Sequence, residues 1–213
     1  MSSHTRVKIC GMTNAEDVAA AIEAGADAVG FIFYRNSPRV VDPALVKQIV
    51  ARLPPMVTPV GVFVNEDVAA VRTIMDRCGL VLAQLHGDET AAFCQELGRP
   101  VMKALRVQDR GSVLALAEFQ GRAGVRGFVL DTFSEKAYGG TGQVFNWELA
   151  AEAAKSATIL LAGGLTAENV GEAIRAVHPY GVDVSSGVES IPGKKDHGKL
   201  RAFLQAVRLV SSA

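Results

Sequence analysis

Cys10 is the first residue whose type and position suit chemistry. It ends the short apolar segment Val7–Cys10, and in an extended strand Lys8 and Cys10 share one face because side chains alternate. An ammonium group beside a thiol lowers the pKa of the thiol and makes it a base or a nucleophile. A cysteine without such a role is a small buried hydrophobe. Both interpretations of Cys10 stay open at this point.

Asp131 raises a similar question, because it closes the apolar segment Gly127–Asp131. A carboxylate there is costly to bury unless it has a partner or a use. It serves either as a general acid or base, or as a cap for the loop backbone. The segment from Thr132 to Phe145 is long for a loop in a compact domain and contains Gly139–Gly142, which favours a loop that closes over a ligand.

Arg39 and His86 are further candidates for polar contacts. Arg39 lies in a loop that Pro38 stiffens, and a guanidinium there can hold a carboxylate or phosphate through two hydrogen bonds. A solvated arginine is the simpler alternative. His86 can titrate near neutral pH or form an ordinary hydrogen bond at the rim. The other histidines do not combine with carboxylates into a metal-ligand pattern, so we expect no metal.

Two glycine-rich turns follow two late apolar segments. One contains Gly163 and Gly164, and the other contains Ser185, Ser186 and Gly187. Small residues in such turns leave backbone N–H groups accessible to an anion. In a barrel of eight strand–helix units, the turns after strands seven and eight commonly form a phosphate site. Together these turns predict that the ligand is phosphorylated.

These residues depend on a regular alternation of apolar strands and helices. We expect strands at Val7–Cys10, Ala28–Phe33, Val60–Val64, Val81–Leu85, Val101–Leu105, Gly127–Asp131, Ile159–Ala162 and Val182–Val184. We expect helices near Ala15–Ala24, Pro43–Arg52, Asp67–Arg77, Glu89–Leu97, Arg110–Phe119, Trp147–Lys155, Ala167–Val177 and His197–Leu209. Helix caps are predicted for Thr13 with Glu16, Thr166 with Asn169, and Asp42 followed by Pro43, with glycine ends at Gly25 and Gly79.

Eight such pairs predict an α/β fold, a closed (βα)8 TIM barrel that forms one domain over residues 1–213. The alternative is an open doubly wound sheet, which would carry a GxGxxG turn after its first strand. Here that turn reads Cys10-Gly-Met-Thr13. In a barrel, the strand ends listed above meet at one rim, where chemistry takes place.

The composition excludes several other classes of protein. The 213 residues carry 22 Lys+Arg and 22 Asp+Glu, so the net charge is zero and we expect no nucleic-acid partner. We also expect no membrane span, because long uninterrupted apolar runs are absent from the sequence. The three separated cysteines and the polar start predict a cytoplasmic protein with reduced thiols. The residues therefore predict cofactor-free acid–base chemistry on a phosphorylated, carboxylated small molecule.

Several motifs, in order along nearly the whole chain, resemble those of the phosphoribosylanthranilate isomerase family. They are Lys8-Ile-Cys-Gly11, Ser37-Pro-Arg39, Gln84-Leu-His-Gly87, Leu130-Asp131, Gly139-Gly-Thr-Gly142 with Phe145, Ala162-Gly-Gly-Leu165 and Asp183-Val-Ser-Ser-Gly-Val-Glu189. The resemblance implies an aldose–ketose isomerase of tryptophan biosynthesis. Such an enzyme converts N-(5'-phosphoribosyl)anthranilate to 1-(2-carboxyphenylamino)-1-deoxyribulose 5-phosphate, an Amadori rearrangement.

The resemblance also implies roles for single residues. Asp131 would be the general acid that protonates the ring oxygen of the sugar, and Cys10, as thiolate, the general base that removes the proton from sugar C2. Arg39 would hold the anthranilate carboxylate. The expected substrate-binding residues are Lys8, Arg39, His86, Gly142, Gly163, Gly164, Asp183, Ser185, Ser186 and Gly187. The expected partner is phosphoribosylanthranilate, bound by a monomer or a homodimer.

One position departs from the family pattern, and other functions compete. Asn146 stands in Phe145-Asn-Trp147 where the family pattern has Asp. A ribulose-phosphate epimerase would need a metal with His and Asp ligands. A bifunctional isomerase shared with histidine biosynthesis would carry an aspartate where this chain has Cys10. A barrel that only binds a phosphometabolite would have no reason to keep both Cys10 and Asp131.

Overall fold

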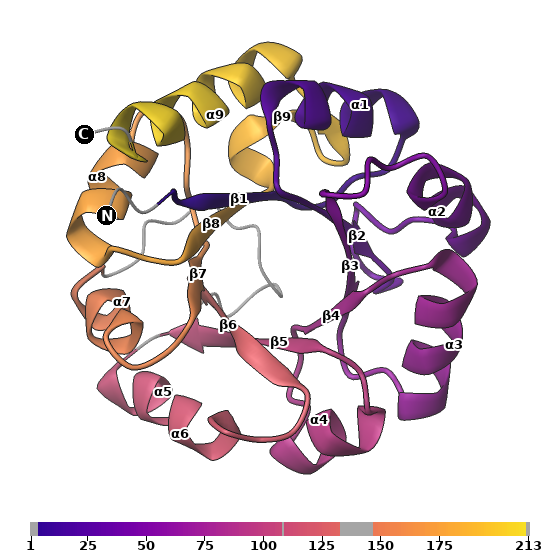
Figure 1. Ribbon diagram of the computed structural model, residues 1–213, viewed down its shortest axis with the longest axis vertical. Coiled ribbons are helices and arrows are strands. Elements are labelled where there is room, and N and C mark those ends of the chain that lie inside the picture. The colour runs from indigo at the N-terminus through magenta and orange to yellow at the C-terminus, as the bar shows by residue number, and fades with distance from the viewer. Residues whose placement is uncertain (1–3, 108, 133–146, 212–213) are drawn as a thin grey trace.

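The computed structural model describes residues 4–107, 109–132 and 147–211, and its central feature is a closed barrel of eight parallel strands. The strands pair in sequence order, and the first closes on the last (Figure 1). They are β1 (Arg6–Ile9), β2 (Ala28–Ile32), β3 (Thr58–Phe63), β4 (Leu82–Leu85), β5 (Val101–Val107), β6 (Val125–Thr132), β7 (Ile159–Leu161) and β8 (Gly181–Val184). The predicted barrel is confirmed, and the open-sheet alternative is wrong.

The helices form an outer ring around these strands (Figure 1). They are α1 (Ala15–Ala24), α2 (Pro43–Val50), α3 (Val68–Cys78), α4 (Ala91–Leu97), α5 (Arg110–Leu114), α6 (Leu116–Phe119), α7 (Trp147–Ala154), α8 (Val170–Val177) and α9 (His197–Ser211). The last helix, α9, packs against α1 and α8, which closes the ring.

Two local features differ from what the sequence predicts. The expected helix Arg110–Phe119 is split into α5 and α6 by a turn at Ala115, and Gly111, a poor helix former, lies in the first turn of α5. A short hairpin also follows β8 and was not expected. It contains η1 (Ser186–Val188), a single 3₁₀ turn, and the antiparallel strands β9 (Glu189–Ile191) and β10 (Lys194–Lys195).

Helix ends mostly follow the predicted caps. The Asp42 side chain accepts from the Ala44 N–H ahead of α2, with Pro43 in the first turn. Gly25 and Gly79 end their helices in the left-handed conformation, where only glycine avoids strain. The Thr13 cap is wrong, because the Thr13 hydroxyl donates to the Gly193 carbonyl and Asn14 caps α1 instead.

Thr166 and Asn169 make half of the predicted capping box. The side-chain oxygen of Asn169 accepts a hydrogen bond from the Thr166 N–H at 2.8 Å. The Asn169 side chain also donates to the Gly164 carbonyl at 2.9 Å. The start of α8 is thereby tied to the turn after β7, which is one of the two turns predicted to bind phosphate.

The inside and the outside of the barrel differ in chemistry. On β6, Phe128 and Leu130 belong to the apolar layer between strands and helices, whereas Val129 points inward to a small apolar cluster that includes Met102, Ala104 and Ala162. One inward position further along the strand comes Asp131, which is 4% exposed. The apolar cluster therefore lies below Asp131 in the interior, and polar side chains occupy the carboxyl-terminal end of the strands. Within the described ranges, no helix combines the length and apolar character needed to cross a membrane.

Candidate active site

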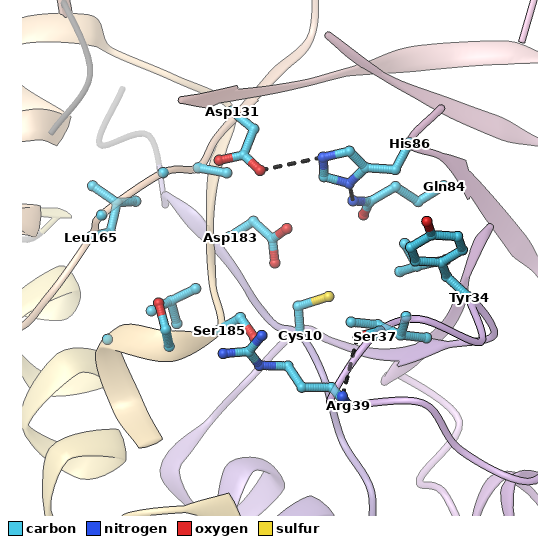
Figure 2. A pocket seen from close by; sticks show the side chains of 18 of the residues that line it. Cys10, Tyr34, Ser37, Arg39, Gln84, His86, Asp131, Leu165, Asp183 and Ser185 are labelled. Atoms are coloured by element: carbon cyan, nitrogen blue, oxygen red, sulfur yellow. Dashed lines mark hydrogen bonds and ion pairs between the residues drawn. The ribbon is translucent and has the colours of Figure 1, made fainter. Parts of the chain in front are cut away.

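A pocket opens at the carboxyl-terminal ends of the strands, and its wall is made by residues that lie on or just after seven of the eight strands (Figure 2). Its lining residues are Cys10, Ile32, Tyr34, Ser37, Arg39, Val62, Val64, Gln84, His86, Asp131, Ala162, Gly163, Gly164, Leu165, Asp183, Val184, Ser185, Ser186 and Gly187. Figure 2 shows Asp131 and His86 on one wall and Cys10 and Arg39 on the opposite wall, with Asp183 between them.

The Cys10 wall is built by β1 and β8. Lys8 and Asp183 are direct partners in the register of these strands, so their side chains meet inside the barrel. The Lys8 ammonium donates to both Asp183 carboxylate oxygens at 2.9 and 3.0 Å, and both side chains are buried. The Cys10 N–H donates to the Val184 carbonyl at 2.8 Å, which holds the thiol at the rim above this ion pair.

Burial decides the acidity of the Cys10 thiol. Desolvation raises the pKa of Cys10 above its ordinary value, and the Asp183 carboxylate adds to the increase, whereas Lys8 and Lys195 act in the opposite direction. For Lys8, burial alone would lower the pKa, but Asp183 and Cys10 raise it above the ordinary value. Lys8 is therefore a cation, and its charge favours the thiolate without overcoming desolvation. The sequence had left this balance open.

Gly30 on β2 provides the space for this pair of groups. A Cβ at Gly30 would lie 2.9 Å from the Cys10 sulfur and 3.1 Å from the Lys8 ammonium nitrogen, closer than atoms normally approach. Any side chain at this position would therefore displace the thiol or the ammonium. Gly30 was not among the predicted site residues, since a lone glycine within an apolar strand carries no signal for this role.

The Asp131 wall is built by β4 and β6. The Gln84 amide donates to His86 Nδ1 at 3.0 Å, which places the proton of a neutral imidazole on Nε2. That Nε2 lies 3.3 Å from the Asp131 Oδ2. His86 therefore faces the carboxylate with its N–H. The sequence indicated His86 and Asp131, but not the role of Gln84 in orienting the ring.

Arg39 reaches the pocket from the loop after β2. Its backbone N–H donates to the Ser37 hydroxyl at 3.1 Å, and its side chain is 12% exposed. A Cβ at Gly11 would lie 2.7 Å from Arg39 Cδ, so the arginine stem passes directly over Gly11. The guanidinium makes a two-pronged pair with Glu189, through Nε and Nη2, both at 2.8 Å. This carboxylate partner was not predicted.

The two glycine-rich turns lie against one another. Gly163 and Gly164 have φ of +87° and +67°, which is the left-handed region that glycine alone adopts without strain. A Cβ at Gly187 would collide with the Leu165 carbonyl oxygen, so the turn after β8 packs directly on the turn after β7. Ser185 and Ser186 complete the pocket wall there.

Three buried polar atoms of this pocket have no hydrogen-bond partner among the described residues: Gln84 Oε1, His86 Nε2 and Ser185 Oγ. Unsatisfied buried polar groups are rare in folded proteins, and each one needs a reason. All three residues line the same pocket, on two opposite walls. The arrangement is typical of a site that completes its hydrogen bonds when a polar ligand binds.

The predicted site residues mostly come together. Lys8 lies beneath the pocket rather than in its wall, Gly142 and Asn146 fall outside the described residues, and the other predicted residues line the pocket. Sequence reasoning did not identify Tyr34, Ser37, Gln84, Glu189 and Lys195. Ser37, Gln84 and Glu189 stood in the quoted motifs, whereas Lys195 lies in a polar run that gives no signal. Within the described ranges, no group of three or more His, Cys, Asp or Glu side chains could hold a metal ion.

Comparisons with known proteins agree with this geometry. A family model described as N-(5'phosphoribosyl)anthranilate (PRA) isomerase matches residues 7–206. The N-(5'-phosphoribosyl)anthranilate isomerase of Pelobacter propionicus is 51% identical over 203 residues, which cover 95% of each chain. The structure of phosphoribosyl anthranilate isomerase from Thermotoga maritima has a TM-score of 0.89 at 40% identity, covering 96% of this chain and 98% of that one. A structure of a phosphoribosyl anthranilate isomerase in complex with reduced 1-(o-carboxyphenylamino)-1-deoxyribulose 5-phosphate has a TM-score of 0.86 at 38% identity, covering 96% of this chain and 98% of that one.

Proposed function

The chain belongs to the N-(5'-phosphoribosyl)anthranilate isomerase family and carries that activity in tryptophan biosynthesis; from this premise we propose how its own residues divide the reaction between two walls of the pocket. The observation that carries the proposal is the placement of Cys10 and Asp131 on opposite walls, next to the paired glycine turns. An acid and a base held apart in this way act on two different atoms of one bound substrate.

The phosphate and the carboxylate of the substrate anchor its two ends. The turns at Gly163–Gly164 and Ser185–Gly187 hold the phosphate through backbone N–H groups and the unpaired Ser185 hydroxyl. Arg39 holds the anthranilate carboxylate, since its guanidinium is a cation in the pocket wall and a good partner for a planar anion. The sugar then lies between Cys10 and Asp131.

Asp131 acts first, as the general acid. It donates a proton to the ring oxygen of the furanose, the ring C–O bond breaks, and the nitrogen lone pair forms the C1–N double bond of a Schiff base. The neighbouring His86 Nε2, 3.3 Å from Asp131, is placed to donate to the Asp131 anion after the proton has left and so to stabilise it. The unpaired oxygen of Gln84 lies on the same wall and accepts from a sugar hydroxyl.

Cys10 acts second, as the general base. Its thiolate removes the proton from sugar C2, and the electron pair moves toward the positively charged nitrogen to give an enolamine. Tautomerisation of the enolamine gives the ketone of the product. Because Cys10 must be a thiolate to act as a base, Lys8 is important: its charge opposes the increase in the Cys10 pKa that burial produces. No residue in this sequence of steps requires a cofactor.

The activity is tested on purified protein with freshly prepared phosphoribosylanthranilate, whose fluorescence falls as it is consumed. We expect turnover with and without a strong chelator. Loss of activity with the chelator would favour a metal-dependent phosphosugar enzyme. Binding of the reduced product analogue without turnover would favour the alternative of a barrel that only binds a phosphometabolite.

Three broader expectations accompany this function. We propose that residues 1–213 act as a single catalytic domain and that the enzyme works in the cytoplasm. A structure of the Thermotoga maritima isomerase describes monomers generated from a dimeric enzyme. Sedimentation velocity on this protein decides between the monomer and the homodimer that the sequence allows.

A further inference from the structure

Glu189, at the start of β9, joins two cations beside the pocket. Its Oε1 accepts from Arg39 Nε at 2.8 Å and from the Lys195 ammonium at 3.0 Å, and its Oε2 accepts from Arg39 Nη2 at 2.8 Å. The side chain is 4% exposed. Burial alone would raise the pKa of Glu189, but the bonds from Arg39 and the charge of Lys195 lower it below its ordinary value. Glu189 is therefore a fixed anion.

Lys195 ties this anion to the two turns that flank Cys10. Its ammonium donates to the Cys10 carbonyl at 2.6 Å and to the Ser185 carbonyl at 3.2 Å, in addition to Glu189. All three N–H bonds of the ammonium are thereby used, and the side chain has no exposed surface. Lys195 thus has no donor left for a substrate, and it acts on the backbone that carries the base and the phosphate turn.

The geometry of the Arg39 pair leaves one edge of the guanidinium available. Glu189 occupies the edge formed by Nε and Nη2, and within the described residues Nη1 donates no hydrogen bond. Arg39, Lys195 and Glu189 carry two positive charges and one negative, so one positive charge is left over beside the pocket. A planar anion that approaches the free edge is matched in both charge and direction.

We propose that Glu189, held by Lys195, is a positioning residue that aims Arg39 at the substrate carboxylate and so determines the selectivity for a carboxylated aromatic amine. This inference rests on the proposed role of Arg39. An arginine has a long, flexible stem, and a bidentate carboxylate partner fixes the plane of its guanidinium before the substrate arrives. Without that partner the arginine still carries its charge, but it must give up conformational freedom in order to bind.

The test compares two substrates on the same enzyme: phosphoribosylanthranilate and its analogue made from aniline, which has no carboxylate. For the unmodified enzyme we expect kcat/KM to favour the carboxylated substrate by about 10- to 100-fold, as for a charge-assisted hydrogen-bonded pair. In Glu189→Gln, an amide N–H group faces the N–H donors of Arg39 Nη2, and the two cannot form a hydrogen bond. We expect this substitution to lower the ratio by roughly tenfold. Arg39→Ala should bring the ratio close to one.

Glu89→Gln is the matched control. Glu89 is also a buried glutamate two residues after the glycine that follows a barrel strand, and it pairs with the buried Lys103 at 2.9 Å. Both glutamates also accept from backbone N–H groups, Glu189 from Gly193 and Glu89 from Asn65 and Gly87. Both substitutions remove one buried charge, so both should lower the thermal midpoint. Only Glu189→Gln should change the substrate ratio.

The outcomes distinguish the role of Arg39 in binding the carboxylate from the positioning role of Glu189. If Arg39→Ala keeps the preference for the carboxylated substrate, the proposed role of Arg39 fails. If Arg39→Ala abolishes the preference and Glu189→Gln retains it in full or increases it, the positioning role of Glu189 is overturned alone. Should Glu189→Gln not fold, Glu189→Asp keeps the charge that Lys195 needs but is too short for both Arg39 nitrogens. The same fall in the ratio is then expected, and an unchanged ratio is the contrary result.

Discussion

The two walls of the pocket differ in the charges that surround their proposed catalytic residues, Cys10 and Asp131. The wall formed by β1 and β8 is densely charged, with the pair Lys8–Asp183 below Cys10 and the group of Arg39, Glu189 and Lys195 beside it. The wall formed by β4 and β6 places a neutral imidazole next to one carboxylate. A thiol must become an anion to remove a proton from carbon, so charges surround it. An acid needs only a proton and a donor that steadies its conjugate base.

The largest expected effect is on the acid wall, from Asp131→Asn. An amide cannot donate a proton to a departing ring oxygen, so we expect kcat to fall by about 10²–10⁴-fold. Asparagine has nearly the same shape, and affinity for the reduced product analogue should stay within a few-fold of the unmodified value. Steady-state kinetics and calorimetric titration measure both quantities, and a near-normal kcat would remove Asp131 from its role.

The next largest effect is expected from Arg39→Ala, and it should appear in KM rather than in kcat. The substitution removes the carboxylate partner while leaving Cys10 and Asp131 in place. We expect KM for phosphoribosylanthranilate to rise by about 10- to 100-fold with a much smaller change in kcat. A large fall in kcat at unchanged affinity would show that Arg39 does more than anchor the substrate.

His86→Asn tests whether the neutral wall depends on the imidazole. His86 Nε2 lies 3.3 Å from Asp131 Oδ2 and is placed to donate a hydrogen bond to it during the reaction. Its loss should lower kcat by about two- to tenfold, the value of one such hydrogen bond. The fall in kcat should be much smaller than in Asp131→Asn. Equal falls in the two variants would mean that His86 itself transfers the proton.

The smallest effect on the maximal rate should come from Asp183→Asn, which changes the pH profile instead. The Asp183 carboxylate raises the pKa of Cys10, so its neutralisation should lower that pKa. The fraction of thiolate then grows at lower pH, and the rising limb of kcat/KM moves toward acid. Alkylation of Cys10 by iodoacetamide as a function of pH measures the same shift directly. Lys8→Met, which removes the opposing cation, should move both curves toward alkali.

The sequence predicted the barrel and much of its rim because both depend on local patterns. Apolar runs of strand length marked the strands, and the alternation of side chains placed Lys8 and Cys10 on one inward face. The glycine turns after β7 and β8 were equally visible. The limits lay in long-range contacts: Glu189 meets Arg39 across 150 positions of sequence, and Thr13 prefers a carbonyl 180 positions away to its own helix. Likewise, the direction of the Cys10 pKa shift depends on burial, which no spacing of residues reveals.

The assignment of Cys10 as base and Asp131 as acid is tested most directly by the kinetic isotope effect with substrate deuterated at sugar C2. In Cys10→Ser, removal of that hydrogen should become rate-limiting, and a full primary isotope effect on kcat is predicted. In Asp131→Asn, opening of the ring should limit the rate, and the isotope effect should fall close to one. Equal isotope effects in the two variants, or a larger one in Asp131→Asn, would contradict the assignment of Cys10 as base and Asp131 as acid.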